Sequence, residues 1–450
     1  MKTIIYNIGT LAGILPEGVL KLEGAQMNEV KCIENAYLVI EDGIITDFGP
    51  MGNCPSTCQE SALPSCRHSD EATTICHSEK LATNCHSEEP ATNCHSEEPA
   101  GRRENLIDAN GGFVLPTFCD SHTHIVYAGC RDGEFRDKIA GLSYEEIAAR
   151  GGGILNSADL LHETSEEELY RQSMERVNEI MAMGTGAVEI KSGYGLTVED
   201  ELKMLRVIKR IKETAPITVK ANFLGAHAVG RAYKGRQREY VDLVCNEMLP
   251  KVAEEGLADY VDVFCDAGFF TVEETAKILE KAAEYGIRPK IHANELEVSG
   301  GVQVGVKYNA LSVDHLEKTT DAEIEALRGS GTMPTMLPGC SFFLGLPYGR
   351  AKEYIEAGLP VALASDYNPG SSPSGNMRFV MALGCIKMRL TPEQSFNACT
   401  INSAYAMGVS DTLGSITIGK KAHLIITKPI PSLAFIPYSH QTSFIEKIIF

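Results

Sequence analysis

Short, alternating apolar runs open the chain. TIIYNI (3–8) is followed by AYLVIEDGIITDFG (36–49), in which Asp42 and Gly43 separate two apolar segments as a hairpin turn does. The pattern predicts β-structure over residues 1–53. After Leu413 the run GSITIGKKAHLIITK returns to short strands. We therefore expect residues 411–450 to join the N-terminal strands in one small β-domain.

Between residues 104 and 410 strand-like apolar runs alternate with amphipathic helical ones. The helical runs carry start and stop signals, such as Thr197 before a cluster of acidic residues and Gly286 after AAEY. Eight β/α units of this kind fit a (β/α)8 TIM barrel of roughly 250 residues. We assign residues 104–113 to a strand of the small β-domain and the entry to the barrel, and residues 114–410 to the α/β barrel itself. The eight runs are FVLPTFCDSHTHI, GAVEIKSGYG, ITVKANFLGAH, YVDVFCDAG, RPKIHANE, ALSVDHLE, GTMPTMLPG and PVALASDYNPG.

Residues 54–103 interrupt this order with a segment rich in Ser, Thr, Glu, Asn, Pro, Cys and His. A segment of this composition buries too little apolar surface to offset its ordering entropy, so we expect a disordered insertion. The unit ATNCHSEEP occurs twice in succession, and each of its cysteines directly precedes a histidine. Adjacent side chains diverge in an extended chain, whereas zinc ligands are usually two to four residues apart. Adventitious metal binding is therefore favoured over a functional site at Cys76, Cys85, Cys94, His68, His77, His86 and His95.

Composition narrows the class of partner. The 60 acidic residues outnumber the 41 basic ones and give a net charge of −19, which disfavours nucleic acid and anionic membranes as partners and leaves a small-molecule substrate. No apolar stretch approaches the roughly 18 residues of a membrane span. The first residues make a poor signal peptide, because polar residues, glycines and a proline break the apolar run. We expect a cytoplasmic protein with reduced cysteines.

Residues able to do chemistry fall at the ends of the strand-like runs, where a TIM barrel has its active site. In HTH, His122 and His124 are two residues apart on a strand, so their side chains leave the same face. Two histidines, a third from another strand and a carboxylate would suit Zn2+ or Fe2+, with one position left for water. The other candidates at strand ends are His227, His292, Glu295, His315 and Asp366.

FCDSHTH, KIHANE, SVDH and ASDYNPGSSP resemble the amidohydrolase superfamily. The resemblance implies a TIM barrel of the metal-dependent amidohydrolase type, with a small β-sandwich domain built from both termini. It also implies a homodimer and one Zn2+ or Fe2+/Fe3+ ion per subunit, held by His122, His124, His292 and Asp366.

EIKSGYGLTVEDELKML and NFLGAHAV are similar to one branch of that superfamily. Its members hydrolyse a ring C–N bond of 4-imidazolone-5-propanoate, giving N-formimidoyl-L-glutamate in histidine degradation. A cation is needed for the propionate of this substrate, and the guanidinium of Arg131 can hold a carboxylate with two parallel hydrogen bonds. The resemblance places substrate contacts at Arg131, Tyr144, Tyr194, His227, Glu295, Asn368, Gly370 and Ser371.

In the expected mechanism Asp366 takes a proton from the attacking water and Glu295 relays a proton to the leaving nitrogen. Which carboxylate has which role stays open. His315 would hydrogen-bond the water or the developing oxyanion.

Several alternatives stay open. The same residues suit a cytosine or guanine deaminase, and an inactive structural paralogue is a third reading. Lys191 could be a carboxylated lysine that bridges two metals, but it lies on the second strand, so a mononuclear site is favoured. ARGGGILN, with Gly151–Gly153, is either a lid or a plain loop. We expect His162, His423 and His440 to be solvated.

Overall fold

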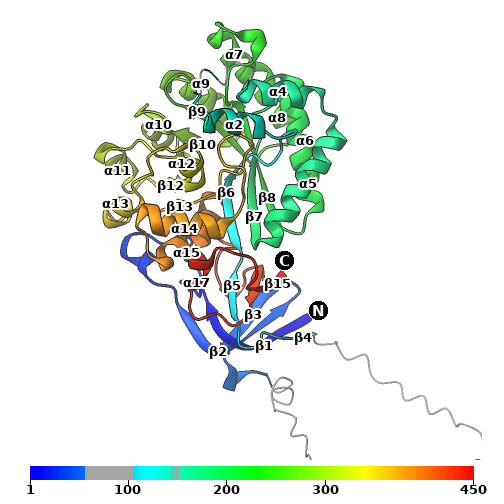
Figure 1. Ribbon diagram of the computed structural model, residues 1–450, viewed down its shortest axis with the longest axis vertical. Helices are drawn as coiled ribbons and strands as arrows, with labels where there is room; N and C mark the ends of the chain where they lie inside the picture. Colours follow the sequence, from blue (N-terminus) through cyan, green and yellow to red (C-terminus); the bar gives the residue numbers. More distant parts are fainter. Residues whose placement is uncertain (56–104, 143–145, 147–151) are drawn as a thin grey trace, which may run out of the picture.

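The computed structural model describes residues 1–55, 105–142, 146 and 152–450. A barrel of eight strands with helices around it stands on a smaller sheet, and both ends of the chain lie in that sheet (Figure 1). The insertion predicted for residues 54–103 lies outside the described residues, except for Cys54 and Pro55.

The smaller sheet joins strands from both ends of the chain, as predicted. β1 pairs with β2, and β2 forms a hairpin with β3 through Asp42 and Gly43, whose φ angles of 49° and 82° suit a tight two-residue turn. The C-terminal strands enter through β14, which pairs with β5. The strand order in this sheet is β15-β14-β5-β1-β2-β3, and β4 also pairs with β1. The strands are β1 (Lys2–Ala12), β2 (Cys32–Glu41), β3 (Ile44–Pro50), β4 (Asn105–Asp108), β5 (Phe113–Pro116), β14 (Leu424–Thr427) and β15 (Ile445–Ile449).

The barrel sheet is parallel, and its strands follow one another in chain order, which confirms the predicted fold class. It closes beside the candidate site: the Asp366 N–H donates to the His122 carbonyl at 3.0 Å, and the His124 N–H donates to the Tyr367 carbonyl at 2.9 Å. The strands are β6 (Phe118–Thr123), β7 (Thr185–Lys191), β8 (Thr218–Ala226), β9 (Tyr260–Cys265), β10 (Arg288–Ala293), β11 (Ser312–His315), β12 (Met333–Met336) and β13 (Ala362–Leu363).

The first apolar run of the barrel forms two strands rather than one. β5 belongs to the smaller sheet and β6 to the barrel, and Thr117 between them donates its N–H to the His423 carbonyl at 3.0 Å. The His423 ring is buried at this junction, with Nδ1 3.1 Å from the Gly186 carbonyl. The expectation of a solvated His423 is therefore wrong, whereas His162 and His440 are exposed.

Helices surround the barrel, and α6 begins at Thr197, the cap that the sequence predicts. The Thr197 hydroxyl accepts a hydrogen bond from the Asp200 N–H at the start of α6, and Thr271 and Glu274 form a capping box at α9. The helices are α2 (Asp132–Ile139), α4 (Ile154–Glu163), α5 (Glu166–Ala182), α6 (Val198–Thr214), α7 (Gln237–Leu243), α8 (Leu249–Glu254), α9 (Val272–Ala283), α10 (Gly301–Lys307), α11 (Asp321–Leu327), α12 (Pro338–Leu344), α13 (Ala351–Glu356), α14 (Met377–Met388), α15 (Pro392–Cys399), α16 (Ile401–Ala406) and α17 (Phe435–Ser439).

Two further sequence expectations concern cysteines and membranes. All nine cysteines in the described part of the chain are free thiols. Among the described residues, every helix is too short or too polar to cross a bilayer.

Candidate active site at the mouth of the barrel

Three imidazole rings converge at the carboxyl ends of the first and fifth barrel strands. His122 lies on β6 with His124 just after it, and His292 lies on β10. Each offers a ring nitrogen, and the three nitrogens lie within 4.8 Å of one another. The Nε2 atoms of His124 and His292 are 3.5 Å apart. The sequence predicted these three residues as metal ligands, and the fold brings them together.

Asp366 completes the group from the segment that follows β13. Its Oδ1 lies 3.5 Å from His122 Nε2 and 3.6 Å from His124 Nε2. The Ser371 hydroxyl donates to Asp366 Oδ2 at 3.2 Å, and the Asn368 amide donates to the Asp366 carbonyl at 2.7 Å. Asp366 has φ of 55°, a left-handed conformation that costs free energy outside glycine and is common at functional sites.

These residues fit a divalent transition metal. Ligand atoms of a tetrahedral zinc ion lie about 3.3 Å apart when the bonds are about 2.0–2.1 Å, close to the separations here. His122 Nε2 is buried and has no hydrogen-bond partner among the described residues. Burial holds the pKa of His122 and of His124 well below the usual range and lowers the pKa of His292 to about 3. Neutral imidazoles keep the lone pair that a metal needs.

Two buried aspartates lie beside the Nδ1 atoms of these rings and orient them. Neither aspartate was among the site residues predicted from the sequence. Asp314 on β11 lies 2.7 Å from His122 Nδ1, and Asp262 on β9 lies 3.0 Å from His292 Nδ1. A carboxylate beside Nδ1 favours the tautomer with the proton on Nδ1, which leaves the lone pair on Nε2. The Nε2 of His122 lies 3.5 Å from Asp366 Oδ1, and that of His292 lies 3.5 Å from His124 Nε2. The sequence signal that could have identified Asp314 and Asp262 is a carboxylate on a barrel strand next to a strand that carries a histidine.

Buried lysines balance the charge of these aspartates. Lys191 Nζ donates to Asp262 at 2.7 Å and to Glu189 at 2.6 Å, and Lys290 Nζ donates to Glu189 and to the Ser121 carbonyl. Burial opposes the ammonium form, but the carboxylates of Asp262, Glu189 and Asp314 outweigh it and raise the pKa of Lys191. Lys191 is therefore an ammonium paired with carboxylates rather than a carboxylated lysine that bridges two metals. This supports a site with one metal ion.

Glu295 and His315 form a second ionisable group beside the four candidate ligands. Their side chains approach to 3.6 Å between Oε2 and Nε2. Burial raises the pKa of Glu295 to about 7. Burial disfavours the imidazolium of His315, but the charges of Glu295 and Glu317 outweigh it and raise the pKa of His315 to about 10. At neutral pH the pair can therefore both donate and accept protons.

His227 and Tyr194 form one wall of the site. The His227 ring stacks on His124 at 5.2 Å between centroids, and its Nδ1 lies 3.0 Å from the Gly193 carbonyl. The Tyr194 ring lies 5.8 Å from His124 and 5.5 Å from His227. Gly193 has φ of 107°, and a Cβ there would lie 2.9 Å from the His227 ring, so glycine permits this close approach.

Arg131 reaches the same region from the start of α2. Its Nη1 is so close to Gly370 that a Cβ on Gly370 would lie 2.2 Å away. Its Nε and Nη2 donate to Glu134 Oε2 at 2.8 and 2.5 Å. Part of the guanidinium that was predicted to bind the substrate carboxylate is therefore already paired with Glu134. Gly370 and Ser371 donate their N–H groups to Asn368 Oδ1. Tyr144, also predicted as a substrate contact, lies outside the described residues.

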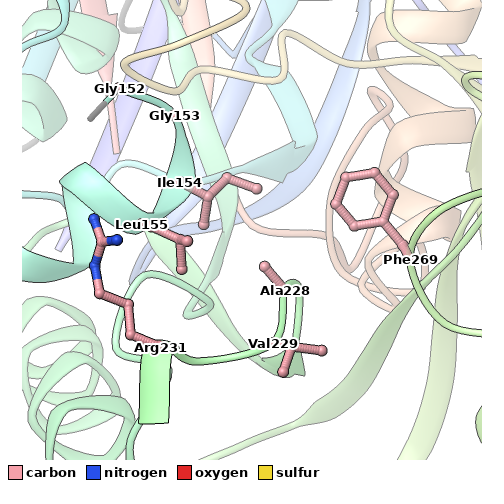
Figure 2. Close-up of a pocket in the computed structure, with 8 residues that line it drawn as sticks. All are labelled: Gly152, Gly153, Ile154, Leu155, Ala228, Val229, Arg231 and Phe269. Carbon is pink, nitrogen blue, oxygen red and sulfur yellow. The ribbon is translucent and has the colours of Figure 1, made fainter. Parts of the chain in front are cut away.

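A pocket of about 260 Å³ opens next to this wall (Figure 2). It adjoins the site because Ala228 and Val229 directly follow His227. The ring of Phe269 also stacks at 4.0 Å on that of Phe264, which lies 5.6 Å from the His292 ring. In Figure 2 the side chains of Ile154 and Leu155 face Ala228 and Val229 across the pocket. Of the glycines in ARGGGILN, Gly152 and Gly153 line this pocket, and Gly151 lies outside the described residues.

A parallel barrel with three histidines and an aspartate at its mouth defines the class of protein. The family model described as amidohydrolase family matches residues 158–435, more than half of the chain. Solved structures with this fold include a triazine hydrolase variant (TM-score 0.68, 14% identity, covering 100% of this chain and 93% of that one) and the guanine deaminase of E. coli (TM-score 0.68, 12% identity, covering 100% and 97%). At such low identity these two structures support the fold alone.

Proteins of similar sequence identify the family within this class of protein. The chain is 53% identical to the imidazolonepropionase of Flavobacterium johnsoniae, over 100% of this chain and 98% of that protein. It is 37% identical to the imidazolonepropionase of Brevibacillus brevis, over 98% of this chain and 94% of that protein. The chain therefore belongs to the imidazolonepropionase family of amidohydrolases.

Proposed function

We propose that this protein hydrolyses the ring C–N bond of 4-imidazolone-5-propanoate, giving N-formimidoyl-L-glutamate in histidine degradation. The observation that carries the proposal is the convergence of three neutral imidazoles and Asp366 next to the Glu295–His315 pair. The full-length similarity to imidazolonepropionases gives the substrate.

One zinc or iron ion per subunit would be held by His122, His124, His292 and Asp366. When bound, such an ion supplies Lewis acidity, which polarises a carbonyl and lowers the pKa of a water molecule at its open position. Imidazole and carboxylate ligands accept both metals. Asp314 and Asp262 keep the rings of His122 and His292 oriented for this task.

The two carboxylates would divide the proton transfers. Burial raises the pKa of Asp366 to about 6, so this carboxylate can take a proton from the attacking water near neutral pH. The carboxyl of Glu295 would then give a proton to the leaving ring nitrogen. His315, which carries a proton at neutral pH, would donate a hydrogen bond to the developing oxyanion. The reverse assignment of the two carboxylates stays open.

Substrate binding would use the residues around this centre. Arg131 would hold the propionate, sharing its guanidinium with Glu134. His227 and Tyr194 would contact the ring of the substrate from one side. Tyr144, Glu295, Asn368, Gly370 and Ser371 complete the proposed set of contacts.

Turnover assays test the proposal against the deaminase alternative. The metal-loaded full chain is mixed with 4-imidazolone-5-propanoate, with cytosine and with guanine in parallel. We expect loss of the imidazolone absorbance and formation of N-formimidoylglutamate, and no ammonia from the two bases. Ammonia from cytosine or guanine with no imidazolone turnover would favour a deaminase, and no turnover of any substrate would favour an inactive paralogue.

The cellular context follows from the same proposal. We place the protein in the cytoplasm, where histidine is degraded, and expect a homodimer. Gel filtration with light scattering would test the dimer.

A further inference from the structure

Glu201 is a buried carboxylate on α6, and the proposed reaction gives it no role. Its side chain is inaccessible to solvent. Burial raises the pKa of this carboxyl, and within the described part of the chain it is hydrogen bonds rather than a neighbouring cation that oppose the rise. A buried carboxylate without an ion pair is costly unless it is well hydrogen-bonded. Its hydrogen-bond partners therefore show which part of the molecule it stabilises.

The partners of Glu201 all belong to the loop that joins β7 to α6. The Gly195 and Leu196 N–H groups donate to Oε1 at 2.7 and 3.0 Å, and the Gly193 N–H donates to Oε2 at 3.1 Å. Ser192 adds a hydrogen bond from its hydroxyl. We call this five-residue segment the SGYGL loop. A single carboxylate thus binds donors from both ends of the loop.

The backbone of the SGYGL loop needs such support. Leu196 has φ of 56°, a left-handed conformation that is unfavourable for a residue with a Cβ. A Cβ on Gly195 would lie 2.3 Å from the backbone nitrogen of Glu201, so the loop packs directly against the start of α6. A backbone in a rarely populated conformation persists only where its surroundings hold it. The carboxylate of Glu201 supplies hydrogen bonds that do so.

The SGYGL loop carries one side of the proposed substrate site. Tyr194 lies at its centre, and the Tyr194 ring is 5.5 Å from the His227 ring. Gly193 connects Glu201 to His227 directly, because its N–H donates to the carboxylate and its carbonyl lies 3.0 Å from His227 Nδ1. A carbonyl at Nδ1 favours the tautomer with the proton on that nitrogen and fixes the orientation of the ring. The position of both aromatic side chains therefore depends on the loop.

We propose that Glu201 is a positioning residue, which holds the SGYGL loop so that Tyr194 and His227 form a preformed wall for the ring of the substrate. A wall of this kind contacts the substrate both before and during the reaction, so its loss should raise KM and leave kcat unchanged. The inference rests on the proposed function for its effect on KM, whereas the order of the loop can be measured without turnover.

Glu201→Gln tests the role of the carboxylate. The glutamine keeps one acceptor oxygen but turns an NH2 group toward a loop of donors, so a buried N–H loses its partner. Loss of a hydrogen bond to a charged group corresponds to roughly 10–100-fold in an equilibrium constant. We expect KM for 4-imidazolone-5-propanoate to rise about 10–100-fold, while kcat and the metal content, measured by elemental analysis, stay at the wild-type values.

Tyr194→Ala distinguishes positioning from a general loss of stability. If Glu201 acts through the aromatic ring on the loop, part of its effect is already lost in Tyr194→Ala. Glu201→Gln should then raise KM by a smaller factor in the Tyr194→Ala background than in wild type. Two independent effects would multiply instead, and that result would contradict the proposal.

Glu199→Gln is the matched control, because Glu199 also lies near the start of α6 but its side chain is 80% exposed. It should behave like wild type. If Glu201→Gln does not fold, Glu201→Asp takes its place, since it keeps the charge but is one methylene too short to reach all three N–H groups. It should raise KM as well. An unchanged KM in a folded variant at position 201 would overturn the proposal.

Amide hydrogen exchange separates failure of this inference from failure of the proposed function. Measured by mass spectrometry on the metal-loaded full chain, exchange in the SGYGL loop should be faster in Glu201→Gln than in wild type and unchanged in Glu199→Gln. Equal exchange in wild type and Glu201→Gln would overturn the inference. If wild type turns over no imidazolone, the proposed function fails, and the exchange difference still decides whether Glu201 holds the loop.

Discussion

At the scale of single residues, Glu295 should separate turnover from metal binding. Glu295 is not one of the four proposed metal ligands, but its carboxyl lies beside His315. We predict that Glu295→Gln keeps its metal, measured by elemental analysis, while kcat falls about 10²–10⁴-fold because a proton-transfer group is lost. Glu297→Gln, at an exposed position two residues on, should retain full activity. Wild-type kcat in Glu295→Gln would remove the proton-transfer role.

Asp314 should act on the metal through His122. An asparagine at position 314 can present its amide N–H to Nδ1, which favours the tautomer with the proton on Nε2 and so blocks the lone pair that faces Asp366. We predict that Asp314→Asn lowers metal affinity about 10–100-fold, measured by competition with a chelator. Asp321→Asn, at an exposed carboxylate, is the control. Unchanged affinity in Asp314→Asn would show that the hydrogen bond does not orient the ring for metal.

The sequence predicts the residues that meet at the site better than the residues that support them. His122 and His124 follow from HTH, and Asp366 follows from its place after the eighth apolar run. The contact between Asp314 and His122 joins positions 192 residues apart. Such a contact depends on the final arrangement of the strands, and an aspartate next to His315 reads equally well as a polar strand end.

At the scale of elements, the cap of α9 gives a test of local stability. Thr271 accepts a hydrogen bond from the Glu274 N–H, and the Glu274 side chain accepts one from the Thr271 N–H. We predict that Thr271→Ala destabilises the protein by about 1 kcal/mol, because one helix N–H loses its partner. The midpoint of urea unfolding should fall accordingly. Thr271→Ser keeps the hydroxyl and should have little effect, so equal losses in both variants would contradict the capping role.

Elements with strong periodicity were predicted well, and boundaries inside apolar runs were not. α6 begins at the predicted Thr197 cap, and α9 ends shortly before the predicted Gly286, because such signals depend on neighbouring residues. The division of the first run between β5 and β6 depends instead on which sheet each half joins. Thr117 marks the division through its hydrogen bond to the His423 carbonyl, a contact with a residue more than 300 positions away. The burial of His423 was missed for the same reason.

At the scale of the whole molecule, the smaller sheet depends on segments from both ends of the chain. β14 pairs with β5, and β5 pairs with β1, so the C-terminal strands are held by the N-terminal half. The proposed metal site also depends on closure of the barrel, since the Asp366 N–H bonds to the His122 carbonyl. Alternating apolar runs predicted both sheets, but the pairing of distant strands is fixed only by packing in three dimensions.

The segment between β3 and β4 in the sequence offers the last prediction, that removal of residues 56–103 leaves catalysis intact. Cys54 should be kept, because it is buried in a cluster with Ile4, Tyr37 and Val39. β4 should be kept as well, because Asn105 pairs with Thr3 on β1. The proposed metal ligands all come from residues 122–366, so a deletion variant closed by a Gly-Ser linker should retain the kcat and the single tightly bound ion of wild type. Steady-state kinetics and elemental analysis after dialysis measure both. Loss of turnover in a folded deletion variant would mean that the Cys- and His-rich repeat contributes to the reaction, and would reverse the assignment of the metal chemistry to HTH.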